Sequence, residues 1–138
     1  MIIGLSHVTF IVNDLERSAM FFSKVFGAKE IYSSGDKTHS LAKEKFFFIG
    51  GLWICAMEGT SNTERSYNHI AFQIQENEIN DYMKRIIDIG AEVKPERPRV
   101  EGEGHSIYFY DFDNHLFELH TGTLNERLHY YNAIADKT

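Results

Sequence analysis

The sequence has one cysteine, two prolines, no long hydrophobic run and no excess of basic residues. Because Cys55 is alone, an intrachain disulfide is excluded, which suits the reducing cytoplasm. No apolar stretch reaches the roughly 20 residues that span a bilayer. The N-terminal MIIGLSHVTF lacks the charged start and long apolar core of a signal peptide. A net charge of −6 argues against nucleic-acid binding. We therefore expect a cytoplasmic protein with no membrane or nucleic-acid partner.

A repeated pattern organises the 138 residues, which suffice for one domain with a substantial core. Residues 6–12 (SHVTFIV) are echoed by residues 68–74 (NHIAFQI). Each of these β-rich stretches is followed by an amphipathic helical pattern, then by a glycine and a final hairpin. We predict a single α+β domain of two βαβββ modules with cup-shaped sheets. Module 1 covers about residues 1–60, module 2 about 61–124, and a tail 125–138.

Local signals place the individual elements. Asn13-Asp14 and Gly27 bracket a helix predicted over residues 15–26, after a strand predicted over residues 5–12. The second helix is predicted over about residues 76–89, and a short polar helix over 124–138. Near the end of module 2, residues 106–110 and 115–120 form the arms of a predicted hairpin. Its turn, DFDN, contains Asp and Asn, which tolerate left-handed backbone conformations.

Glu118 is a carboxylate in the middle of the second, otherwise apolar arm. Alternation places it on one strand face with Leu116 and His120. Two interpretations are open. Glu118 points to solvent, as residues on one face of an antiparallel strand often do, or it is buried. A buried carboxylate must be paired or bound to a metal, because a buried, unpaired charge is very costly.

Two histidines support the interpretation of Glu118 as a metal ligand. His7 and His69 occupy equivalent positions in the two repeats, and repeated modules bring equivalent strands to a shared cleft. With Glu118 they form a set of two imidazoles and one carboxylate, which suits a divalent metal with open positions. His120, on the same face as Glu118, is the rival ligand.

The segment PERPRVEGEG, residues 95–104, contains both prolines of the chain and two glycines, so we predict an irregular loop. Arg97 and Arg99 make it locally basic. On composition alone it is a solvated surface loop. Cys55, beside Trp53 and Ile54 in an apolar strand, is interpreted as a small buried residue.

The chain resembles the vicinal oxygen chelate superfamily and, within it, the fosfomycin resistance proteins of the hydrolysing FosX type. The resemblance spans nearly the whole chain. It is carried by GLSHVTFIV, by EKFF from residue 44, by YNHIAFQI from residue 67 and by RPRVEGEGHSIYFYDFDNHLFELHTGTL from residue 97. It implies a metal bound by His7, His69 and Glu118, with Mn(II) expected first and other divalent metals possible. It also implies that Glu44 activates water; without it, Glu44 in AKEKF would be interpreted as a solvated surface charge.

Fosfomycin, a small epoxide with a phosphonate group, makes three chemical demands. A Lewis acid polarises the epoxide oxygen, cations and hydroxyls bind the phosphonate, and a base takes a proton from the attacking water. The resemblance implies a substrate pocket formed by Thr9, Trp53, Tyr67, Ser106, Tyr108 and Arg127. Arg97 and Arg99 of the charged loop are further candidates, and the choice between them stays open.

Three alternatives are weighed against hydrolysis. They are a metal-dependent transferase that adds glutathione or another small thiol to fosfomycin, a ring-cleaving non-haem iron dioxygenase, and a drug-binding protein without chemistry. The resemblance further implies a module-swapped homodimer, in which His7 comes from one subunit while His69 and Glu118 come from the other.

Overall fold

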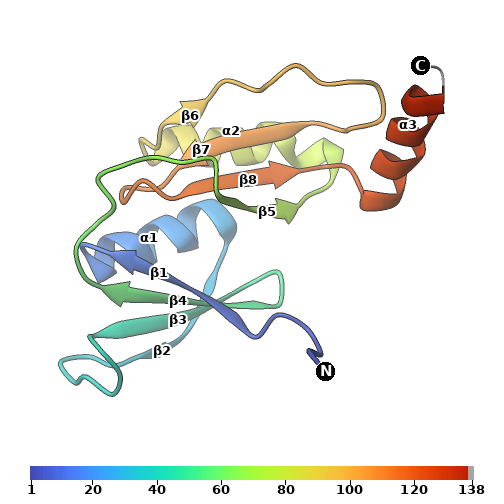
Figure 1. Ribbon diagram of the computed structural model, residues 1–138. Helices are drawn as coiled ribbons and strands as arrows, with labels where there is room; N and C mark the ends of the chain where they lie inside the picture. The colour runs from blue at the N-terminus through green and yellow to red at the C-terminus, as the bar shows by residue number, and fades with distance from the viewer. Residues whose placement is uncertain (137–138) are drawn as a thin grey trace.

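The computed structural model describes residues 1–136 and contains two four-stranded sheets (Figure 1). The first sheet has the strand order β1 (His7–Val12), β4 (Leu52–Glu58), β3 (Glu44–Ile49) and β2 (Lys29–Ser33). The second has the order β5 (His69–Gln73), β8 (Leu116–His120), β7 (Ser106–Tyr110) and β6 (Val93–Lys94). In each sheet the first and last strands of the module pair in parallel, and the other pairs are antiparallel. The prediction of two βαβββ modules is confirmed.

Helix α1 (Leu15–Phe26) begins and ends where the local signals predict. The Asp14 side chain accepts the N–H of Arg17 at 3.0 Å, and Gly27 closes the helix with φ 64°. The second helix, predicted over residues 76–89, is a 3₁₀ turn (Glu76–Glu78) followed by α2 (Ile79–Asp88). Its start is marked by the Glu78 side chain, which accepts the N–H of Gln75 at 2.9 Å.

Helix α3 (Leu124–Asp136) is the predicted tail helix, whose last two positions, 137 and 138, lie outside the described residues. The first strand, predicted from residue 5, begins at His7, and the last, predicted from residue 115, begins at Leu116. Among residues 1–136, the helices are all too short or too polar to cross a bilayer.

Helix α1 lies between the two sheets, as Figure 1 shows. Its Phe22 ring lies 5.2 Å from Phe47 of the first sheet and 6.2 Å from Phe117 of the second, measured between ring centroids. On β1 and β5 the alternate residues Val8, Phe10, Ile70 and Phe72 also pack against this core. Because strand side chains alternate, the remaining residues point away from α1. The two sheets therefore have outer faces on opposite sides of the helical layer.

The turn between β7 and β8 supports the end of the second sheet. The Asp111 carboxylate accepts the N–H of Asp113 at 2.9 Å and of His115 at 2.8 Å. Asn114 adopts the left-handed conformation with φ 64°, as the sequence predicts. This tight turn places β8 beside β7 in the register that brings Glu118 opposite Tyr108.

Candidate metal and anion site

His69 and Glu118 meet on the outer face of the second sheet. The Nε2 atom of His69 lies 3.0 Å from Oε1 of Glu118, and its Nδ1 atom lies 2.6 Å from the backbone oxygen of Tyr67. If Nδ1 carries the proton donated to that oxygen, Nε2 and the carboxylate both present lone pairs. A proton or a metal ion must then lie between them, and a backbone acceptor that orients a metal-binding imidazole is a common arrangement. The pair therefore fits two neighbouring ligands of one divalent metal.

Glu118 is buried but hydrogen-bonded. The Ser106 hydroxyl donates to Oε2 at 2.5 Å, and Arg99 Nη2 lies 3.6 Å from the same oxygen. Burial opposes ionisation, yet the hydrogen bond from Ser106 and the neighbouring His120 and His69 bring the pKa of Glu118 below its ordinary value. The carboxylate therefore stays ionised, as a metal ligand must.

Anion donors surround this pair. The Tyr108 hydroxyl receives hydrogen bonds from Arg99 Nη2 at 2.9 Å and from the Tyr67 hydroxyl at 3.1 Å. Burial raises the pKa of Tyr108 to about 12, so its hydroxyl stays protonated. Of the two loop arginines, Arg99 turns inward, with a side chain 10% exposed. Arg97 is 40% exposed and pairs with Glu103 instead.

His120 completes a hydrogen-bonded chain behind the carboxylate. Its Nδ1 atom lies 2.7 Å from the Ser106 hydroxyl, and its Nε2 atom lies 3.2 Å from Nη2 of Arg127. Because a guanidinium only donates, Nε2 accepts, and Nδ1 carries the proton of a neutral ring. Burial lowers the pKa of His120, which favours the neutral form. With both nitrogens engaged, the rival ligand supports Glu118 through Ser106 rather than replacing it.

The outer face of the first sheet carries the other predicted residues. On β1, His7 and Thr9 point away from the core, and the His7 ring lies 4.2 Å from the Trp53 ring. On β3, Glu44 is buried, so its interpretation as a solvated charge is wrong. The Cys55 thiol donates to Glu44 Oε2 at 3.5 Å. Burial and the charge of Glu44 raise the pKa of Cys55 to about 11, which keeps the thiol protonated.

The predicted site is divided between these two faces. His69 and Glu118 lie on the second sheet and His7 lies on the first, with α1 between the sheets (Figure 1). Within the described residues 1–136, no group of three His, Cys, Asp or Glu side chains is arranged to hold a metal ion. One chain thus supplies two of the three predicted ligands to one face and the third to the other.

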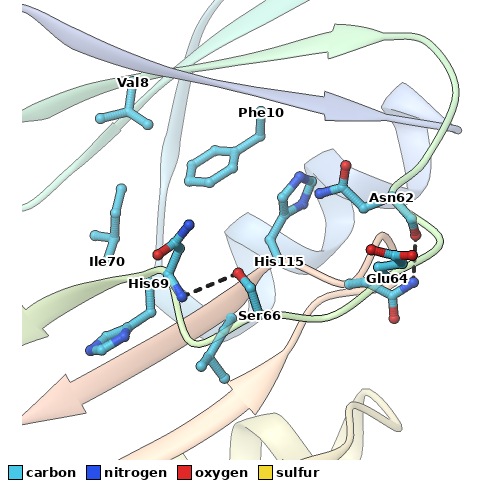
Figure 2. Close-up of a pocket in the computed structure, with 11 residues that line it drawn as sticks. Val8, Phe10, Asn62, Glu64, Ser66, His69, Ile70 and His115 are labelled. Carbon is cyan, nitrogen blue, oxygen red and sulfur yellow. Dashed lines mark hydrogen bonds between the residues drawn. The ribbon is translucent and has the colours of Figure 1, made fainter.

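A cavity of about 360 Å³ lies at the junction of the modules, where Val8 and Phe10 of β1 face the segment before β5 and the turn before β8 (Figure 2). The His69 ring extends away from Val8 and Phe10 in this view. His115 at the cavity wall is bound to Asp111, its Nδ1 atom 2.7 Å from Oδ2. Of the metal and anion site on the second sheet, only His69 contributes to the lining of this cavity.

Sequence reasoning missed one buried charge near the site. Glu103 is 2% exposed and binds Nη2 of Arg97 at 2.6 Å. In the sequence it is one acidic residue among several in a polar loop, and the loop has no period that separates inward from outward positions. Only the folded chain shows that Glu103 is buried while the nearby Glu101 is exposed.

Known proteins are similar to this chain over nearly its whole length. Residues 4–119 match the model of the Glyoxalase/Bleomycin resistance protein/Dioxygenase superfamily. The fosfomycin resistance protein FosX of Listeria monocytogenes is 66% identical over 96% of this chain and 99% of its own. FosX of Mesorhizobium japonicum is 57% identical over 93% and 92%. The metallothiol transferase FosB of Shouchella clausii is 40% identical over 98% and 91%.

Solved structures of the Listeria FosX share the fold. A mutant in complex with Mn(II) and 1S,2S-dihydroxypropylphosphonic acid has a TM-score of 0.88 and 63% identity, over 95% of this chain and 99% of that one. A second structure, with Mn(II) and a sulfate ion, has a TM-score of 0.87 at the same identity and coverage.

Proposed function

The chain belongs to the glyoxalase/bleomycin resistance protein/dioxygenase superfamily and, within it, to the FosX-type fosfomycin resistance proteins, and we propose that it is a Mn(II)-dependent hydrolase that opens the epoxide of fosfomycin with water. The oxygen of water forms a bond to an epoxide carbon, the ring C–O bond breaks, and protonation of the released oxygen gives the vicinal diol. The observation that carries the proposal is the His69–Glu118 pair beside Arg99 and Tyr108 on one sheet face.

The metal would be held by His7, His69 and Glu118. When bound, it supplies a Lewis acid for the epoxide oxygen. Support comes from the opposed lone pairs of His69 and Glu118 and from the ionised state of the buried carboxylate. Mn(II) accompanies the diol product in the solved Listeria FosX. Other divalent metals accept the same ligands.

The phosphonate would be bound by cations and hydroxyls of the second sheet. Arg99 and Tyr108 already hydrogen-bond to one another beside Glu118, and a guanidinium with a planar fork of donors suits a phosphonate. Ser106 and Arg127 reach the same face through the chain of hydrogen bonds with His120, and Tyr67 contacts Tyr108. Arg97 would stabilise the loop rather than bind the phosphonate, because it pairs with Glu103.

Glu44 would take the proton from the attacking water. It is buried on the outer face of the first sheet, where water can be held apart from bulk solvent. The neighbouring Cys55 thiol is protonated, so it donates to the carboxylate instead of acting as a nucleophile. Thr9 and Trp53, from the same face, would line the pocket together with Glu44.

The complete site would form between two copies of the chain. Because α1 separates the two outer faces, His7, Thr9, Glu44 and Trp53 of one copy would face the His69–Glu118 side of another. We propose a homodimer in which each copy, one domain over residues 1–138, contributes to two equivalent sites. We also propose a cytoplasmic location, in keeping with the single, unpaired Cys55.

A second candidate is transfer of a small thiol to fosfomycin, which the 40% identity to a metallothiol transferase favours. A ring-cleaving dioxygenase and a binder without chemistry fit less well. A ring-cleaving dioxygenase does not need a group of side chains that bind a phosphonate. A binder without chemistry does not need an ionised carboxylate beside an oriented imidazole.

The proposed reaction is tested by incubating the protein with Mn(II) and fosfomycin in the absence of thiol and recording phosphorus NMR spectra. We expect the diol signal to appear, and a chelator to stop it. A product that appears only after glutathione or another small thiol is added would identify a transferase. Retention of unchanged fosfomycin under both conditions would exclude both enzymatic functions.

A further inference from the structure

Glu103, in the loop between β6 and β7, is a buried carboxylate that the proposed reaction does not use. Its side chain is 2% exposed. It accepts hydrogen bonds from Arg97 Nη2 at 2.6 Å, from the Val100 N–H at 2.8 Å and from the Tyr131 hydroxyl at 2.8 Å. The hydrogen bond from Arg97, followed by that from Val100, lowers the pKa of Glu103 to about 2. The group is therefore a fixed negative charge in the interior of the loop.

Towards the site, Glu103 faces Arg99. The Nη1 atom of Arg99 lies 3.5 Å from Oε2 of Glu103, while its Nη2 atom contacts Tyr108 at 2.9 Å and Glu118 at 3.6 Å. Nη1 is buried and has no hydrogen-bond partner among residues 1–136. A guanidinium removed from water is costly unless negative charge lies nearby. Glu103 supplies that charge at Nη1, as Glu96 does at Nε from 3.2 Å. With Nη1 turned to Glu103, the Nη2 atom points to Tyr108 and Glu118.

Towards the C-terminus, Glu103 holds helix α3. The Tyr131 hydroxyl of α3 donates to it, and the Tyr130 ring packs so closely on Gly102 that a side chain at position 102 would overlap the ring. The same helix carries Arg127, whose Nη2 lies 3.2 Å from Nε2 of His120. One carboxylate thus connects the loop to the helix that delivers a second cation to the same face.

We propose that Glu103 is a positioning residue that holds Arg99 directly, and Arg127 through Tyr131, in the orientation that receives the anionic group of the substrate. The proposal rests on the proposed function for the identity of that substrate. Glu103 does not touch the substrate and acts only through the two arginines.

The test compares Glu103→Gln, which keeps the shape of the side chain and removes its charge, with Glu101→Gln, an exposed carboxylate of the same loop. Two quantities are measured for each protein: KM and kcat for fosfomycin, and the dissociation constant of inorganic phosphate by calorimetry with Mn(II) present. We expect Glu103→Gln to raise KM and the phosphate dissociation constant about tenfold, a loss similar to that caused by removing a group that orients a ligating side chain. We expect kcat to stay within about threefold, because the loss falls on binding. Glu101→Gln should leave both quantities unchanged.

An unchanged phosphate dissociation constant in Glu103→Gln would overturn the proposal, as would a fall in kcat with KM unchanged, or a wild-type protein that does not bind phosphate. If the wild-type protein binds phosphate but leaves fosfomycin intact, the proposed function fails while the phosphate comparison still decides the role of Glu103. If Glu103→Gln does not fold, Tyr131→Phe decides. It should weaken phosphate binding and speed amide exchange in α3, relative to Tyr130→Phe, and unchanged phosphate binding would overturn the proposal.

Discussion

At the scale of single residues, Glu44, the proposed general base, has a buried and hydrogen-bonded environment. Its carboxylate is buried, its backbone N–H donates to the Ser34 hydroxyl at 3.0 Å, and the Cys55 thiol donates to its side chain. A carboxylate held in this way suits proton abstraction from one bound water.

We predict that Glu44→Gln lowers kcat for diol formation by about two to four orders of magnitude, the usual range for loss of a general base. The substitution keeps size and removes basicity, so Mn(II) binding should not change. Phosphorus NMR measures the product, and calorimetry measures the metal. Glu58→Gln, at the exposed end of β4, is the matched control and should behave as wild type. Diol formation at the wild-type rate in Glu44→Gln would remove the residue from the reaction.

The sequence predicts some of these residues better than others. Glu118 could be singled out because a carboxylate in an apolar strand is unusual, and the structure places it next to His69. The burial of Glu44 could not be predicted from AKEKF, because it depends on contacts with Ser34 and Cys55 that this local pattern does not reveal. The sequence also does not show that Arg99, and not Arg97, turns inward, because an irregular loop has no periodicity that separates buried from exposed positions.

At the scale of elements, Asp113 joins the β7–β8 turn to the start of α1. It is 1% exposed and accepts the N–H of Asn13 at 2.9 Å, and the Ser61 hydroxyl donates to the same carboxylate. Arg17 of α1 lies 3.9 Å away. A turn of the second module thus holds the helix of the first, and this contact helps to fix how the two sheets are arranged around α1.

We predict that Asp113→Ala lowers the free energy of unfolding by about 1–3 kcal/mol, because the hydrogen bonds from Asn13 and Ser61 lose their buried acceptor. Urea denaturation at one fixed protein concentration measures the loss, since the stability of the proposed dimer would depend on concentration. Asp36→Ala is the control: this exposed side chain lies 3.8 Å from Lys43, and we expect a change within about 0.5 kcal/mol. A loss below about 1 kcal/mol in Asp113→Ala would mean that the contact does not hold the modules together.

The elements themselves are largely predictable, because their signals are local. Asp14 and Gly27 mark α1, and the Asp-Asn turn before β8 marks the last hairpin. The position of α1 between the two sheets is not predictable in this way. It depends on which aromatic side chains meet across the core, such as Phe22 with Phe117, and these are far apart in the sequence.

At the scale of the whole molecule, the residues of the proposed site are divided between two outer faces. The first sheet presents His7 and Glu44, the second presents His69 and Glu118, and α1 lies between the sheets. A reaction that needs a metal, a base and an anion pocket at one point cannot be carried out by these faces while they point apart. The proposed association of two copies, face to face, would bring the complementary halves together twice in one closed dimer.

The central claim, that the site which hydrolyses fosfomycin is shared between two chains, is tested most directly by mixing His7→Ala with Glu118→Ala. Each protein alone should be inactive, because each lacks a metal ligand at both sites. After subunit exchange in equal amounts, half of the dimers are mixed and one of their two sites is intact, so about a quarter of wild-type diol formation should return. Phosphorus NMR measures that rate, with exchange verified by mass spectrometry of tagged subunits. No recovery of activity despite verified exchange would place all three ligands on one chain and contradict the account.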